Sequence, residues 1–204
     1  QRQMCIRDRE EAGLAPAHDL HIVSLALDRL RAWIDADLPV VPVSANLARS
    51  TLLDPLLARR LEVLLRERRL PACLLHLEVS EEAWRLDPDQ LRCALMRLQA
   101  AGFSVAVDDF GVDNANVSLF VQLEFDVLKM DRSLIWGIDA TDRTMRVVSG
   151  LASLCDDLSI ESVAEGIETE QQLEALKTTG CTRAQGYLIG RPSAIDEFER
   201  RFMA

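Results

Sequence analysis

The chain has 204 residues, enough for one domain with a substantial core but few for two. Its formal net charge of −10 argues against a general nucleic-acid binder, which needs a basic face. No uninterrupted apolar run approaches the roughly 20 residues that cross a bilayer, so no membrane segment is expected. The 5 cysteines are odd in number and none shows the C-x-x-C spacing, which favours a reduced, cytoplasmic protein.

The first nine residues, QRQMCIRDR, show neither a helical nor a strand period. We interpret residues 1–9 as a remnant of cloning or of sequence assembly and leave them out of the fold prediction. The domain is then expected to occupy residues 10–204.

Helical and strand patterns alternate from about residue 18 onward. Strands are predicted at residues 38–46, 74–80, 103–110, 126–131, 159–166 and 183–190. Helical patterns cover residues 22–33, 47–69, 81–102, 141–158, 168–180 and 194–202, and residues 116–124 form a short apolar element. Repeated β-α units predict an α/β fold with a parallel sheet, either open and doubly wound or closed as a (β/α)8 barrel. Neither standard glycine-rich nucleotide-binding motif follows any of these strands.

Each predicted strand ends in a side chain that can bind a metal ion or a phosphate. In chain order these residues are Asn46, Glu78, Asp108 with Asp109, Lys129, Glu165 and Gln185. A lone Asp-Asp at a strand end is most simply the start of a loop, but six such ends from six strands are hard to obtain by chance. In a (β/α)8 barrel these ends meet on the face where active sites form.

The residue types indicate a metal-assisted reaction on a phosphate. Oxygen ligands without cysteine or histidine select hard divalent cations such as Mg²⁺, Mn²⁺ or Ca²⁺. Adjacent aspartates suit two ions about 3.5–4 Å apart, the spacing of two-metal phosphoryl hydrolysis. Lys129 could then hold the attacking water or stabilise charge on the phosphate.

Six ordered motifs resemble those of the EAL domain family of bacterial signalling proteins. They are VPVSANLA, LHLEVSE, VAVDDFG, VLKMDRS, ESVAEGIETE and AQGYLIGRP. The resemblance covers about residues 10–204 and implies a modified (β/α)8 TIM-type barrel, present here as about six β-α units. It also implies a phosphodiesterase that needs two Mg²⁺ or Mn²⁺ ions and hydrolyses cyclic di-GMP to linear pGpG.

The resemblance assigns a role to each motif residue. Asn46, Glu78, Asp108, Asp109 and Glu165 match the metal ligands. Lys129 matches the residue that contacts the catalytic water, and Gln185 matches one that supports the site. Glu81 matches the glutamate that holds the loop after the Asp-Asp strand, and Glu168 matches the second glutamate of the EGIE motif. Cyclic di-GMP is the implied partner, with a homodimer through the barrel as an option and no nucleic-acid polymer.

Two departures from the family pattern keep alternatives open. The Glu-Ala-Leu motif is absent, so we expect that the chain lacks a first segment with two strands, a metal-ligating glutamate and a substrate arginine. The loop after Asp109 reads VDNAN where the family has Thr-Gly-Tyr-Ser-Ser. The alternatives are therefore an inactive module that binds cyclic di-GMP or a protein partner in a regulatory role, and another metal-dependent barrel enzyme.

Overall fold

The computed structural model describes residues 12–80, 83, 86–112 and 117–203, which form two compact units. The first unit contains the described residues up to Val105, together with residues 122–124 and 202–203. The second contains the described residues of 106–121 and residues 125–201. Glu81, most of the VDNAN loop and residues 1–9 lie outside the described residues.

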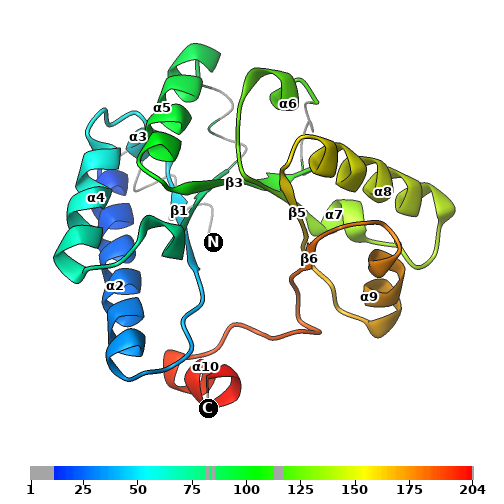
Figure 1. Cartoon of the computed structure of the whole chain (residues 1–204). Coiled ribbons are helices and arrows are strands. Elements are labelled where there is room, and N and C mark those ends of the chain that lie inside the picture. Colours follow the sequence, from blue (N-terminus) through cyan, green and yellow to red (C-terminus); the bar gives the residue numbers. More distant parts are fainter. Residues whose placement is uncertain (1–11, 81–82, 84–85, 113–116, 204) are drawn as a thin grey trace. The chain divides into compact units, whose positions relative to one another are not determined.

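The first unit packs helices against two parallel strands. Its elements are α2 (Ala15–Asp35), β1 (Val43–Leu47), α3 (Arg49–Leu52), α4 (Leu57–Arg68), the 3-10 helix η1 (Ala72–Leu74), β2 (Leu75–Val79) and α5 (Pro88–Ala100). Helix α2 packs on α4 and on β1 (Figure 1). Its buried side chains include Val23, Leu27 and Leu30, which recur at helical spacing and so form one apolar face.

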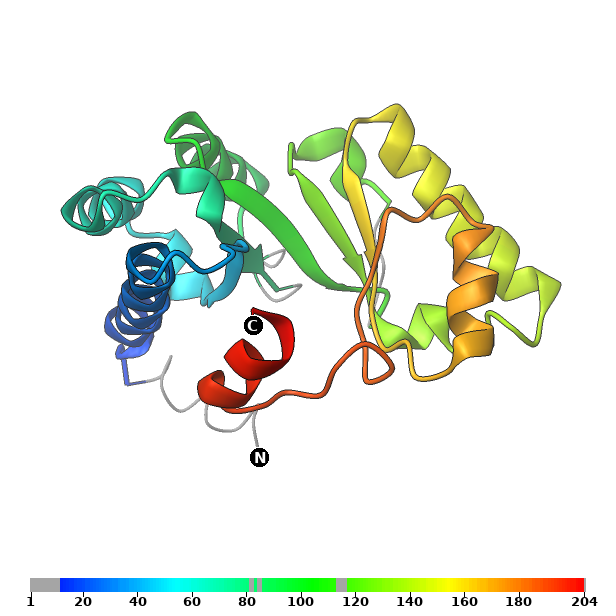
Figure 2. The same ribbon diagram turned by 60° about the horizontal axis from the view of Figure 1, so that its bottom comes forward.

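The second unit is built on parallel strands. Strand β3 (Ser104–Phe110) starts in the first unit and continues into the second. There follow α6 (Leu119–Gln122), β4 (Val127–Met130), α7 (Arg132–Ile135), α8 (Asp142–Asp157), β5 (Glu161–Ala164), α9 (Glu170–Lys177), β6 (Arg183–Ala184) and α10 (Ile195–Phe202). The strands β3, β4, β5 and β6 pair in this order, and every pair is parallel. Figure 2 shows α8 and α9 on the same side of β5.

Local chemistry explains where the helices α5 and α9 begin. The Asp87 side chain accepts a hydrogen bond from the Gln90 backbone N–H, and Pro88 takes the first helical position of α5. Helix α9 starts with a capping box, in which Thr169 and Gln172 each bind the other's backbone N–H. The starts of these helices fix where the preceding loops leave the strands.

The predicted alternation is confirmed, but several bounds differ. The helix predicted at residues 22–33 begins at Ala15, and the strands predicted at residues 38–46 and 159–166 are shorter, at Val43–Leu47 and Glu161–Ala164. The single helix expected at residues 47–69 is split into α3 and α4, because the chain turns at Asp54 and Pro55. In this turn Asp54 Oδ1 accepts a hydrogen bond from Leu56 N–H. The strand expected at residues 183–190 is reduced to Arg183–Ala184. It ends early because Gly186 starts a turn, in which the N–H groups of Ile189 and Gly190 donate to its carbonyl.

None of the helices in the described ranges is long and apolar enough to span a membrane.

We expect the thiols to react in the order of their exposure. Cys73 and Cys93 are exposed, whereas Cys155 lies on the buried face of α8. Burial raises the pKa of the Cys155 thiol to about 11, so its reactive thiolate is scarce at neutral pH. Iodoacetamide followed by peptide mass spectrometry should modify Cys73 and Cys93 in the native chain and Cys155 only in denaturant. Equal labelling of Cys155 and Cys73 in the native chain would contradict this burial.

Candidate metal centre

Lys129 lies between two carboxylates of the second unit. It sits on β4, whose four residues are all buried, and 9% of its side chain is exposed. Its Nζ donates a hydrogen bond to Asp108 Oδ1 at 2.6 Å and lies 2.9 Å from Glu165 Oε1. One ammonium group therefore joins carboxylates from β3 and from the loop after β5.

A bulge in β3 places the two adjacent aspartates opposite this lysine. Val107 pairs with Leu128 and Phe110 with Met130, so Asp108 and Asp109 together oppose the single residue Lys129. Asp109 has φ 58°, in the left-handed region that residues other than glycine rarely adopt. In a regular strand, neighbouring side chains point to opposite faces. The bulge removes this alternation and allows both carboxylates to reach the same site.

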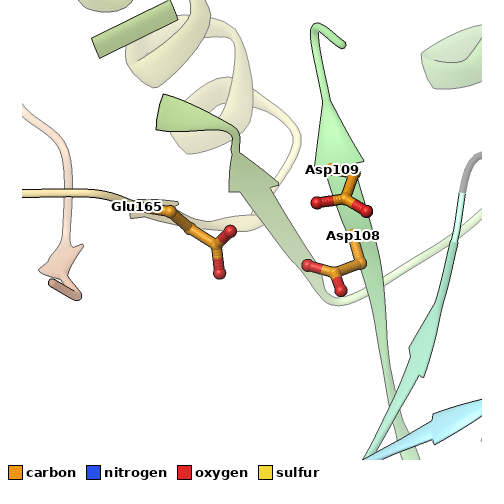
Figure 3. A group of neighbouring side chains, drawn as sticks. All are labelled: Asp108, Asp109 and Glu165. Carbon is orange, nitrogen blue, oxygen red and sulfur yellow. The ribbon is translucent and has the colours of Figure 1, made fainter. Parts of the chain in front are cut away.

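The carboxylates of Asp108, Asp109 and Glu165 form a group with the geometry of a cation site. One oxygen from each lies within 4.8 Å of the others. Figure 3 shows the three side chains, with Asp108 and Asp109 next to each other on β3. Three carboxylates against the single Lys129 ammonium leave these four side chains with a negative formal charge. Oxygen donors at this spacing fit Mg²⁺ or Mn²⁺ and do not suit a thiolate-preferring metal.

Asn46 and Glu78 are placed together in the first unit. They lie at the ends of β1 and β2 and are partners in the register of this parallel pair, so their side chains share one face. Glu78 is buried and Asn46 is exposed. The structure thus brings together two of the predicted ligands in the first unit and three in the second.

Gln185 and Glu168 lie in the second unit near the segment that carries Glu165. The Gln185 backbone N–H donates to the Ala164 carbonyl at 2.8 Å, and its side chain is exposed. Glu168 is exposed, with Oε1 3.9 Å from Arg132 Nη1. The role expected for Glu81 falls on a residue outside the described ranges.

Asp19 supports the segment after Asn46, and the sequence analysis did not single it out. It is 9% exposed in α2, and its Oδ2 accepts hydrogen bonds from Ala48 N–H at 2.8 Å and Thr51 Oγ1 at 2.6 Å. Asp19 precedes the helix predicted at residues 22–33, so the apolar face of that predicted helix did not include it. This contact ties α2 to the loop that leaves β1.

We expect Asp19→Ala to lower the free energy of unfolding by about 2 kcal/mol, because it leaves two donors without their charged acceptor. Asp35→Ala is the matched control, since it removes an exposed ion pair with Arg31 from the same helix and should change stability by less than about 0.5 kcal/mol. Urea denaturation of both variants measures the difference. If both variants lower the free energy of unfolding equally, then the Asp19 hydrogen bonds stabilise the fold no more than a surface ion pair does.

Comparisons with known proteins identify relatives of this chain. The sequence profile of the EAL domain matches residues 3–192. Cyclic di-GMP phosphodiesterase NbdA of Pseudomonas aeruginosa is 37% identical over 188 residues, which cover 90% of this chain and 23% of that protein. The chain thus spans about a quarter of the length of this curated relative.

Solved structures share the fold. The EAL domain of Mycobacterium smegmatis DcpA matches with a TM-score of 0.80 and 27% identity, over 88% of this chain and 81% of that one. The manganese and cyclic di-GMP complex of Klebsiella pneumoniae BlrP1 matches with a TM-score of 0.78 and 29% identity, over 87% of this chain and 45% of that one. The predicted TIM-type α/β fold class is therefore confirmed.

Proposed function

The chain belongs to the EAL domain family, and on this premise we propose that it hydrolyses one phosphodiester bond of cyclic di-GMP to give linear pGpG. The observation that carries the proposal is the group of Asp108, Asp109 and Glu165 around Lys129. The proposed cofactors are two Mg²⁺ or Mn²⁺ ions.

The chain's own carboxylates would hold these ions. Asp108, Asp109 and Glu165 would supply oxygen ligands in the second unit. Asn46 and Glu78 match further ligands of the family, and they share one face of the β1–β2 pair in the first unit. When bound, a pair of divalent cations supplies Lewis acidity toward water and the phosphate. The bulge at Asp108 and Asp109 supports this assignment, because strained backbone at a strand end is common where side chains are aimed at a site.

Lys129 would act on the reacting groups through its ammonium. Its side chain is held between Asp108 and Glu165, so the position of Nζ is set before substrate arrives. From there it would orient the attacking water and stabilise the charge that develops on the phosphate. Glu165 would fix Lys129 from the other side and would share in binding the cation. Gln185, whose backbone pairs beside Glu165, would support the site.

The first test measures cation binding. An ion that binds only the native state raises its stability, so Mn²⁺ should raise the melting temperature above that measured in chelator. Asp108→Asn should reduce this rise, whereas Glu174→Gln, which alters an exposed ion pair with Lys177 in the same unit, should not. Superimposable melting curves in Mn²⁺ and in chelator would reject the metal centre.

The second test measures the reaction. Chromatography should detect pGpG when the chain is incubated with cyclic di-GMP and Mn²⁺, and no pGpG in chelator. Binding of cyclic di-GMP without any pGpG would instead support the regulatory module. Failure to bind cyclic di-GMP would reject both functions.

A further inference from the structure

Gly186 lies where no larger residue fits. A Cβ at this position would overlap the backbone N, C and O atoms of Ile167. The φ of Gly186 does not fall among the positive values found at six other glycines of the described residues, so a left-handed backbone is not what requires glycine there. It is therefore the close approach of Ile167, and not backbone conformation, that requires glycine here.

Hydrogen bonds tie the backbone around Glu165 to the backbone around Gly186. The Gln185 N–H donates to the Ala164 carbonyl at 2.8 Å, and the Ile167 N–H donates to the Gln185 carbonyl at 3.1 Å. The Leu188 N–H donates to the Ile167 carbonyl, also at 3.1 Å. Glu165 thus lies in a short segment that is held on both sides by residues 185–188.

A shift of this segment would reach the acidic group directly. Ile167 is fully buried and follows Glu165 by two residues, and the Glu165 N–H donates to the Met130 carbonyl at 2.9 Å. A methyl group on residue 186 would meet backbone atoms, which cannot rotate away as a side-chain end can. Either Ile167 or the turn at residues 186–190 must then move, and Glu165 moves with respect to Lys129.

We propose that Gly186 is a positioning residue for Glu165: its missing side chain lets the turn after β6 pack on Ile167 and so sets the distance between the Glu165 carboxylate and Lys129. The catalytic consequence rests on the proposed function, whereas the structural consequence does not.

The test compares Gly186→Ala with Gly150→Ala. Gly150 lies in α8 of the same unit, and a Cβ there meets nothing within 4 Å. Both variants add one methyl group, and alanine in a helix is better tolerated than glycine. Two readouts are needed: the ¹³C resonance of the Glu165 carboxyl, assigned by its loss in Glu165→Gln, and kcat and KM for cyclic di-GMP with Mn²⁺.

We expect Gly186→Ala to melt cooperatively, to move the Glu165 resonance and to lower kcat by about 100-fold, the effect of a displacement of about 1 Å, with less than about a threefold change in KM. Gly150→Ala should change neither the resonance nor kcat. An unmoved resonance in Gly186→Ala would overturn the proposal. Loss of cooperative melting would also overturn it, because Gly186 would then be required for folding of the unit. If the parent chain produces no pGpG, the proposed function is rejected. The Glu165 resonance of Gly186→Ala, compared with that of the parent, then tests the positioning role by itself.

Discussion

We expect Lys129→Met to lower the free energy of unfolding by about 3 kcal/mol in chelator, which is the lower end of the effect of breaking a buried ion pair. The lysine is 9% exposed and lies within 2.6 Å of Asp108 and 2.9 Å of Glu165, so its removal leaves these carboxylates facing each other without that ammonium. For a chain of this size the melting temperature should fall by roughly 6–12 °C. Scanning calorimetry measures both quantities.

The same variant should recover much of this loss in Mn²⁺. In the parent, the Lys129 ammonium offsets the repulsion between the carboxylates. In the variant a bound cation takes over this role, so Mn²⁺ should raise the melting temperature of Lys129→Met more than that of the parent. The matched control is Lys177→Met, because Lys177 Nζ also lies 2.6 Å from a carboxylate, that of Glu174, but both side chains are at least 60% exposed. Its stability should change by less than about 1 kcal/mol. If Lys129→Met melts below the parent by the same number of degrees in Mn²⁺ and in chelator, then Asp108 and Glu165 do not share a cation site.

We expect Asp108→Asn to lower kcat/KM for pGpG formation by at least about 100-fold. Loss of a group that only orients a metal ligand lowers metal affinity or activity by about 10–100-fold, and loss of a ligand should have a larger effect. Asparagine keeps the shape of the side chain and can still accept the hydrogen bond from Lys129, which is 2.6 Å long in the parent. A lower rate of this variant is therefore caused by the missing negative charge and not by a disrupted fold.

The control for this variant is Asp156→Asn. Asp156 and Asp157 also form an adjacent pair, but they are exposed at the end of α8, so their substitution should leave kcat/KM within a factor of about two. Rates are to be measured over a range of Mn²⁺ concentrations. If Asp108→Asn reaches the parent rate at saturating Mn²⁺, then Asp108 contributes affinity for the cation but not catalysis.

The sequence by itself determined the alternation of strands and helices and the residues at the strand ends. Both are local properties: side chains repeat with the period of each element, and a buried strand such as β4 reads as a run of apolar residues with Lys129 near its end. Because the carboxyl ends of parallel strands lie at one edge of a sheet, the order of the residues was enough to predict that Asp108, Lys129 and Glu165 would meet.

Only the tertiary structure decided how these residues meet. The bulge that aligns Asp108 with Asp109 depends on the register between β3 and β4, which the composition of either strand alone does not encode. The contacts of Asp19 with the loop after β1, and of Gly186 with Ile167, join segments about 20 to 30 residues apart. Such contacts depend on distances between packed elements, and these distances arise only when the units fold.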